Sequence, residues 1–252
     1  MKRFEFVGLA NFMKLFSDKY IGISLKNNLE FTVKGVPCTV LLALLAAVLV
    51  FHAPKLSQVF RNVLFLPYIT SSIAVATVWK IMYLPDKGVI NALLNAVGIM
   101  ETPRWLYSTS TSMISVVIVA VWQGFGYAML FLLAGLQGIP QALYEAGEMD
   151  GAVGWKRFVH ITFPLLTPTI FFVVVTNMIN SFKVFDLILQ MTEGGPANST
   201  NVLVYRIYQE GILKMNMGYA SAIAMLLFAL VLILTIVQFI LQKRWVFYSE
   251  EA

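Results

Sequence analysis

The chain has 252 residues, of which 59% are hydrophobic and only 12% charged, and its mean hydropathy is +0.77. Soluble domains of this length carry about 25% charged residues, so the composition excludes a disordered chain, a secreted disulfide scaffold and an ordinary cytosolic enzyme. The net charge of +5 is spread thinly along the chain, which argues against a nucleic-acid partner. The single cysteine, Cys38, leaves no internal disulfide or cysteine metal cluster. The composition therefore indicates an integral membrane protein.

Apolar segments recur along the chain at the length that a bilayer requires. A hydrocarbon core of about 30 Å needs about 20 mostly apolar helical residues. The segments that meet this length are residues 29–51, 63–84, 113–136, 163–182 and 219–241. They predict an all-α, polytopic helical bundle over residues 29–241, with an amphipathic N-terminal segment at 1–28 and a tail at 242–252.

A polar segment, residues 137–164, separates the third and fourth predicted spans. Pro140 suits the first turn of a helix, and Gly151 can end that helix at positive φ. Leu143, Ala146 and Met149 share one helical face, and Trp155 begins a second short amphipathic helix. Two such helices lie in a membrane interface or insert into a partner's groove. The acidic residues of the first helix favour a protein partner.

The same segment resembles the EAA loop of binding-protein-dependent ABC importers. Glu145-Ala146-Gly147 is followed by Gly151 at the motif's offset and then by Ile161-Thr162-Phe163-Pro164. Two positions depart from the motif, because Gly147 replaces Ala and Phe163 replaces Leu. Glycine at 147 is expected to weaken the first helix by about 1 kcal/mol relative to alanine.

Other motifs narrow the resemblance to the sugar permeases of the carbohydrate-uptake branch, and to the first of their two permease subunits. These motifs are Leu66-Pro67-Tyr68, Phe185-Asp186 and Thr192-x-Gly194-Gly195-Pro196. The resemblance implies the type I ABC importer transmembrane architecture in a bacterial inner (cytoplasmic) membrane. It also implies four kinds of partner: a second permease, ABC ATPase subunits, an extracytoplasmic solute-binding protein and a sugar.

The resemblance further implies a set of residues that couple the chain to its ATPase. These are Tyr144, Glu145, Ala146, Gly147, Asp150 and Gly151. The carboxylates of Glu145 and Asp150 would accept charge-assisted hydrogen bonds in a cleft of the ATPase subunit. The alternative is that both are ordinary solvated helix charges.

Two groups of residues are candidates for the substrate path. Gly124, Phe125 and Tyr127 resemble a pattern that lines the sugar site of maltose-type permeases, while Asn177, Asn180 and Ser181 are polar groups at helical spacing. Amides within a span either face a cavity or bond neighbouring helices. The solute stays open among a disaccharide, an oligosaccharide and a glycerol phosphodiester.

The chain contains no Gly-x-x-x-x-Gly-Lys-Ser/Thr phosphate loop, and His52 and His160 stand without a carboxylate or cysteine at ligand spacing. We therefore predict a non-catalytic subunit without cofactor or metal. A membrane enzyme would need ionisable residues within its spans. A self-sufficient channel or secondary transporter remains the alternative, and it would need no acidic helix–glycine–helix element.

The orientation of the chain receives two conflicting indications. More Lys and Arg residues lie on the side of segment 1–28 than on the side of segment 137–164, and the positive-inside rule would place the former in the cytoplasm. The family usually has one more leading transmembrane helix, and residues 4–12 resemble the segment directly after that helix. The resemblance therefore places residues 1–28 outside and the EAA loop inside, with the tail.

Overall fold

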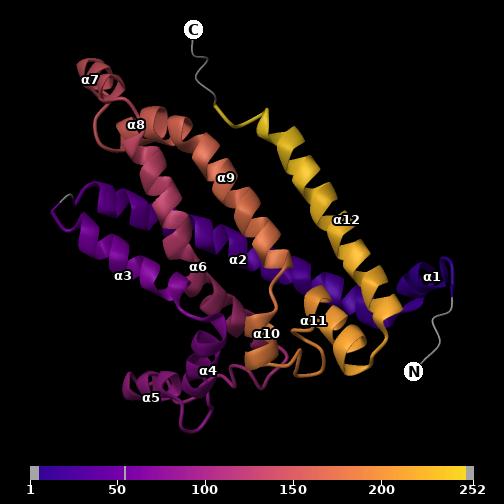
Figure 1. The fold of residues 1–252 in the computed structure, drawn as a ribbon. Helices are drawn as coiled ribbons and strands as arrows, with labels where there is room; N and C mark the ends of the chain where they lie inside the picture. The colour runs from indigo at the N-terminus through magenta and orange to yellow at the C-terminus, as the bar shows by residue number, and fades with distance from the viewer. Residues whose placement is uncertain (1–5, 54, 248–252) are drawn as a thin grey trace. The chain divides into compact units, whose positions relative to one another are not determined.

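The computed structural model describes residues 6–53 and 55–247, and all regular structure in this part of the chain is helical (Figure 1). The α-helices are α1 (Ala10–Ser17), α2 (Lys19–Phe51), α3 (Ser57–Ile69), α4 (Ser72–Met82), α5 (Val89–Ala96), α6 (Ser112–Gln137), α7 (Gln141–Met149), α8 (Trp155–Arg157), α9 (Phe163–Phe182), α10 (Asp186–Met191), α11 (Leu203–Tyr208) and α12 (Met217–Gln242). Two π-helical turns, η1 (Phe158–Thr162) and η2 (Gln209–Leu213), follow α8 and α11. Residues 1–5 of the predicted N-terminal segment and 248–252 of the predicted tail lie outside the described residues.

Four helical runs in the described residues are long and apolar enough to cross a membrane. They are α2, α6, α12 and the continuous run Trp155–Phe182, which joins α8, η1 and α9. The broken pair of α3 and α4 makes a fifth if it forms one span. These runs overlap the five predicted spans, and their helical character agrees with the predicted fold class.

The segment predicted as a span at 63–84 is not one continuous helix, because it is broken between α3 and α4, which are bent by 91°. Pro67 lies in α3 and lacks the N–H that would continue the helical ladder. α3 ends at Ile69, and Thr70 is extended with φ −77° and ψ 144°. The Thr70 hydroxyl donates a hydrogen bond to the Leu66 carbonyl at 2.9 Å, which satisfies one group at the helix end.

The helix that contains the first predicted span begins at Lys19, before the predicted boundary at residue 29. The added turns carry buried polar side chains that a hydropathy scan does not count as membrane-spanning. Asn27 Nδ2 donates to the carbonyls of Asn198 and Asn201 at 2.8 and 2.9 Å, and Asn28 Oδ1 accepts from the Leu203 N–H at 2.8 Å. These hydrogen bonds connect α2 to the turn that contains the Gly194-Gly195-Pro196 motif.

The chain divides into two compact units, each built from three segments. Unit 1 comprises Met1–Lys34, Ser72–Val119 and Asn180–Ile233, and unit 2 comprises Gly35–Ser71, Ala120–Ile179 and Leu234–Ala252. α2, α6, α9 and α12 each continue from one unit into the other. The transmembrane region predicted over 29–241 is therefore not split into two units that follow each other along the sequence.

Unit 2 has a core of small and branched apolar side chains from α2, α6 and α9. Ala43 and Ala47 of α2 are fully buried with Met129 and Leu132 of α6 and Leu166 of α9. Glycines in α6 bring backbones close together: a Cβ on Gly126 would meet the Leu64 carbonyl of α3. Small residues at such contacts allow the close helix packing that membrane bundles use.

Candidate functional site

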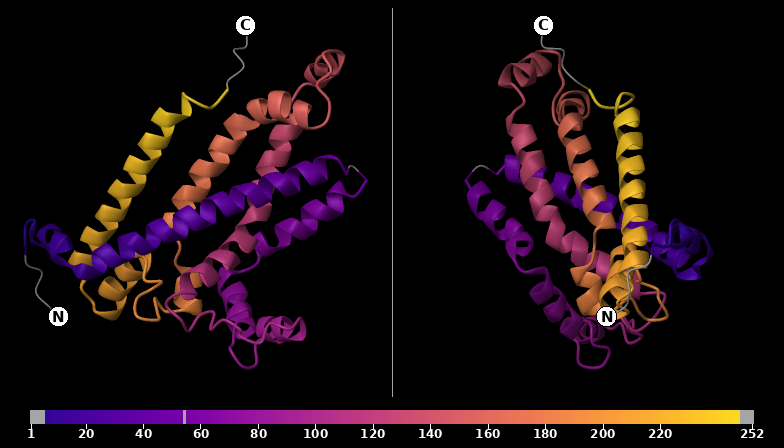
Figure 2. Two further views of the ribbon diagram at one scale, coloured as in Figure 1. Left: turned by 180° about the vertical axis from the view of Figure 1, so that it is seen from behind. Right: turned by 45° about the vertical axis from the view of Figure 1, so that its right-hand side comes forward.

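The segment predicted as an EAA loop is a helix followed by a glycine turn. Pro140 is the N-cap of α7, and α7 ends at Met149. Gly151 has φ 74° and Gly154 has φ 56°, left-handed conformations that glycine adopts readily. The second predicted short helix is not separate, because α8 continues through η1 into α9. Figure 2 shows α7 and α8 at the end of α6 and the start of α9 from two sides.

One face of α7 is fixed to the start of the following long helix. Tyr144 is buried, its hydroxyl lies 3.4 Å from the Thr162 hydroxyl that donates to it, and the Arg157 guanidinium lies over its ring at 5.7 Å. Arg157 also forms an ion pair with Glu148 at 2.9 Å. These contacts join α7 to α8 and η1, which continue into α9.

Gly147 lies on the same buried face of α7. A Cβ at this position would meet the δ-methyl of Ile161, and the Gly147 carbonyl accepts the Ala152 N–H at 2.7 Å. The departure from the EAA motif is therefore matched by a packing partner on η1. From the sequence, we expected only that glycine has a lower helix propensity than alanine.

The opposite face of α7 is exposed and mixes apolar with acidic side chains. Leu143 is 42% and Met149 89% exposed, and Glu145, Ala146 and Asp150 are exposed beside them. The apolar face recognised in the sequence is thus the outer one, whereas the side chains that pack inward are Tyr144 and Gly147. Further exposed apolar residues follow in the chain, Val153 at 62% in the turn and Trp155 at 76% at the start of α8. We call this set of residues, together with Gly151, the α7 face.

The predicted coupling residues therefore divide into two groups. Glu145, Ala146, Asp150 and Gly151 belong to the α7 face, and Tyr144 and Gly147 attach α7 to its own chain. The residues of the α7 face that were not among the predicted coupling residues are Leu143, Met149, Val153 and Trp155. Their signal was the run of large apolar side chains in an otherwise polar loop.

The aromatic member of the predicted substrate path in α6 belongs to an aromatic ladder in unit 2. The Tyr127 ring stacks on Tyr68 of α3 at 4.4 Å and 13°, and it meets Phe131 edge-on at 4.9 Å. The ladder extends to Phe65 beyond Tyr68 and to Phe172 of α9 beyond Phe131. Tyr68 is 41% and Phe172 45% exposed, so the ladder is partly open at these two residues.

The other predicted path residues of unit 2 are less open. Phe125 packs against the apolar core, and the nearest atom to a Cβ on Gly124 is Thr39 Cγ2 at 4.0 Å. Asn177 is half-buried and donates to the Val173 carbonyl of its own helix at 2.8 Å.

Asn180 and Ser181 belong to unit 1 and differ from each other. Asn180 is exposed, whereas the buried Ser181 hydroxyl shares a hydrogen bond of 2.7 Å with the Thr32 hydroxyl of α2. Ser181 thus has the helix-bonding role that sequence analysis kept as an alternative.

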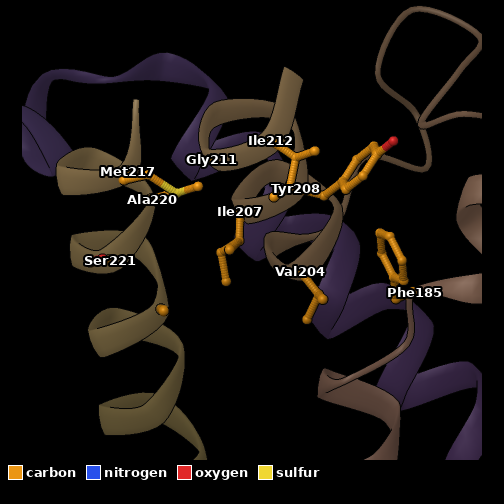
Figure 3. A pocket seen from close by; sticks show the side chains of 10 residues that line it. Phe185, Val204, Ile207, Tyr208, Gly211, Ile212, Met217, Ala220 and Ser221 are labelled. Atoms are coloured by element: carbon orange, nitrogen blue, oxygen red, sulfur yellow. The ribbon is translucent and has the colours of Figure 1, made fainter. Parts of the chain in front are cut away.

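A pocket of about 330 Å³ opens in unit 1 between α11, η2 and α12 (Figure 3). Its lining is mostly apolar and includes Phe185, Ile207 and Met217, with hydroxyls at Tyr208 and Ser221. A sugar needs several polar partners as well as an aromatic face. The pocket therefore suits an apolar group better than a sugar.

Comparison with known proteins places the chain in one family. Residues 39–247 match the family described as binding-protein-dependent transport system inner membrane component. The chain is 37% identical over 246 residues to the sn-glycerol-3-phosphate transport system permease protein UgpA of Agrobacterium fabrum, covering 97% of this chain and 83% of that protein. It is 38% identical over 236 residues to the probable ABC transporter permease protein YurN of Bacillus subtilis, covering 92% and 81%.

Solved structures share the fold. The chain superimposes with a TM-score of 0.83 on a chain of a bacterial ABC transporter involved in the import of the acidic polysaccharide alginate, at 23% identity over 95% of this chain and 84% of that one. The same score is found for an alginate ABC transporter in complex with alginate pentasaccharide-bound periplasmic protein. The fold is the type I ABC importer transmembrane architecture, embedded in a membrane. These matches confirm the resemblance to sugar permeases seen in the motifs, and the chain belongs to the family of binding-protein-dependent ABC importer permeases.

Proposed function

We propose that this chain is one permease subunit of a bacterial sugar importer and that ATP is hydrolysed by a separate subunit docked on the α7 face. It works in the cell membrane with a second permease and receives its solute from an extracytoplasmic binding protein. The observation that carries the proposal is the α7 face itself. This exposed surface includes the apolar Met149 and Trp155 and the acidic Glu145 and Asp150. Because α7 is attached by side-chain contacts to a long apolar helix, the surface suits docking to a mobile partner.

The buried side of α7 supplies the mechanical connection between the ATPase and the long helix α9. Closure of the ATPase dimer on ATP displaces α7, and the Tyr144, Glu148 and Gly147 contacts carry that displacement into η1 and α9. Such coupling requires the two states of the ATPase to contact the α7 face differently. A partner that bound both conformations of the permease equally well would not shift the equilibrium between them.

The aromatic ladder supports a sugar as the solute. Sugar rings stack on aromatic side chains, and the partly exposed Tyr68 and Phe172 supply aromatic surface, with phenolic hydroxyls on Tyr68 and Tyr127. UgpA is named for sn-glycerol-3-phosphate, and the structural neighbour imports alginate. A neutral aromatic surface favours a di- or oligosaccharide over a glycerol phosphate.

The experiment is solute uptake by proteoliposomes that contain both permeases, the ATPase and the binding protein. We expect Glu145→Lys to lower uptake and solute-stimulated ATPase activity by about tenfold or more, since losing a hydrogen bond to a charged group costs roughly 1.5–3 kcal/mol. Glu101→Lys is the matched control, because Glu101 is also exposed but lies far along the chain from α7. Equal uptake by the two variants would reject docking through Glu145. Uptake without any ATPase would instead support a self-sufficient transporter.

A further inference from the structure

Helix α1 is held against the rest of unit 1 by a buried cluster of charges. Asp18, which follows α1, accepts hydrogen bonds from the Tyr219 hydroxyl at 2.7 Å and from the Arg206 guanidinium at 3.2 Å. Arg206 also pairs with Glu210 at 2.9 Å. Burial raises the pKa of the Asp18 carboxyl, but the hydrogen bonds from Tyr219, the Tyr20 N–H and Arg206 outweigh burial and hold that pKa below its usual value. The carboxylate therefore stays charged and keeps α1 in place.

The apolar core of unit 1 fixes the rotation of α1 about its own axis. Leu15 is buried in a cluster with Tyr219 and Ile223 of α12. Asn11, Leu15 and Asp18 follow each other at helical spacing, and the Asn11 side chain lies 3.0 Å from where a Cβ on Gly218 would be. One face of α1 therefore packs against the protein.

The opposite face of α1 is apolar and exposed. Its members repeat at i, i+3, i+4 and i+7 and are Leu9, Phe12, Met13 and Phe16, exposed by 70%, 39%, 67% and 94%. We call these residues the α1 apolar face. A helix that could rotate would hide them, but the contacts of Leu15 and Asp18 prevent this.

The neighbours of α1 define the depth at which this face lies. α12 has 26 residues and is about 39 Å long at 1.5 Å per residue, which exceeds a hydrocarbon core of about 30 Å. The helix is therefore long enough for its first turn to reach the headgroup layer. Lys14 of α1 lies over the ring of Tyr219 in that turn, with Nζ 4.1 Å from the ring centroid, and Figure 1 shows α1 beside the start of α12.

The charges around the α1 apolar face match a lipid surface. Lys14, Lys19 and Lys26 are exposed, and the one acid among residues 6–28, Asp18, is paired with Arg206. Amphipathic helices with lysines beside an apolar face lie in the plane of anionic bilayers.

We propose that α1 is an interfacial anchor that lies in the headgroup layer and inserts Leu9, Phe12, Met13 and Phe16 among the lipid acyl chains. Its other sides face unit 1 and water. Bound in this way, α1 and its charge cluster hold the ends of α2 and α12 at a fixed depth in the bilayer. The proposal does not depend on which solute the chain transports.

The test attaches an environment-sensitive fluorophore, NBD, to a single cysteine in the full chain. Cys38→Ser removes the native thiol, and Phe16→Cys places the label on the α1 apolar face. Ser17→Cys is the matched control, because Ser17 is also exposed but lies about 100° further round the helix than Phe16, at the border of the α1 apolar face next to Met13. Both side chains are exposed, so neither substitution removes a core contact. The vesicles contain phosphatidylcholine and phosphatidylglycerol, with or without nitroxide-labelled lipid.

We expect the label at position 16 to emit at shorter wavelength than the label at 17 and to be quenched at least twofold more strongly by the nitroxide lipid. Iodide in the water should quench the label at 17 more strongly. Equal iodide quenching at both positions would show that water covers the face and would overturn the proposal. A blue-shifted label at 16 that the nitroxide lipid does not quench, with or without the second permease, would show a protein contact and would overturn it too.

Discussion

Arg206 and Lys214 pair with the same carboxylate but in different surroundings. The Glu210 carboxylate lies 2.9 Å from the Arg206 guanidinium and 2.7 Å from the Lys214 ammonium. The Arg206 side chain is 10% exposed and the Lys214 side chain 56%. The two ion pairs therefore differ in burial rather than in distance.

We predict that Arg206→Gln lowers the free energy of unfolding by about 3–5 kcal/mol, because it leaves Asp18 and Glu210 without their shared buried cation. Lys214→Gln should change it by about 1 kcal/mol or less, as expected for an exposed pair. Thermal unfolding of the purified chain in detergent measures both. Equal losses in the two variants would show that the cluster does not behave as a buried ion pair.

This cluster could not be predicted from the sequence. Asp18 and Arg206 are separated by 188 positions, and each taken alone is an ordinary charge near the end of a helix. By contrast, Glu145 and Asp150 were recognisable because the motif around them is short and local. Local spacing reveals a site that one helix carries, whereas a site assembled from distant segments needs the fold.

At the level of helices, two glycines of α6 show how closely the elements pack. A Cβ on Gly126 would meet the backbone carbonyl of Leu64 in α3, which cannot move aside alone. A Cβ on Gly124 would be 4.0 Å from the methyl group of Thr39, an ordinary contact. Gly126 thereby brings Tyr127 against Tyr68.

We predict that Gly126→Ala destabilises the chain by about 1–3 kcal/mol, since overpacking must push α3 away from α6. Gly124→Ala should be neutral or stabilising by up to about 1 kcal/mol, because alanine is the better helix former. The measurement is again thermal unfolding in detergent. If Gly126→Ala were as stable as Gly124→Ala, the close approach of α3 and α6 would be refuted.

The helices themselves show which features hydropathy can predict. The long apolar runs of α6, α9 and α12 are close to the predicted spans, because uninterrupted apolar sequence leaves few alternatives in a membrane. The start of α2 was missed, since Asn27 and Asn28 look like loop residues until their partners in the turn after α10 are known. The break after Ile69 was missed as well, since Pro67 is common in membrane helices and does not by itself announce an end.

In the whole molecule, each long helix belongs to both compact units. Unit 2 contains the α7 face and the aromatic ladder, and unit 1 contains the charge cluster and the α1 apolar face. The sequence motifs predicted the family, and they predicted the helix and glycine turn within residues 137–164 that we propose as the coupling segment. They did not predict which side of α7 is open, because Leu143 and Met149 look like core residues in a pattern of period 3.6.

Docking of the ATPase on the α7 face can be tested directly by site-specific crosslinking. Met149→Cys in a Cys38→Ser chain places a thiol on that face, where the native side chain is 89% exposed. Asn62→Cys is the control, because Asn62 is exposed in the same unit but lies in α3. We expect a nucleotide-dependent crosslink from position 149, and none from position 62, to the ATPase of the assembled transporter. An assembled, ATP-hydrolysing complex in which position 149 forms no such crosslink would contradict it.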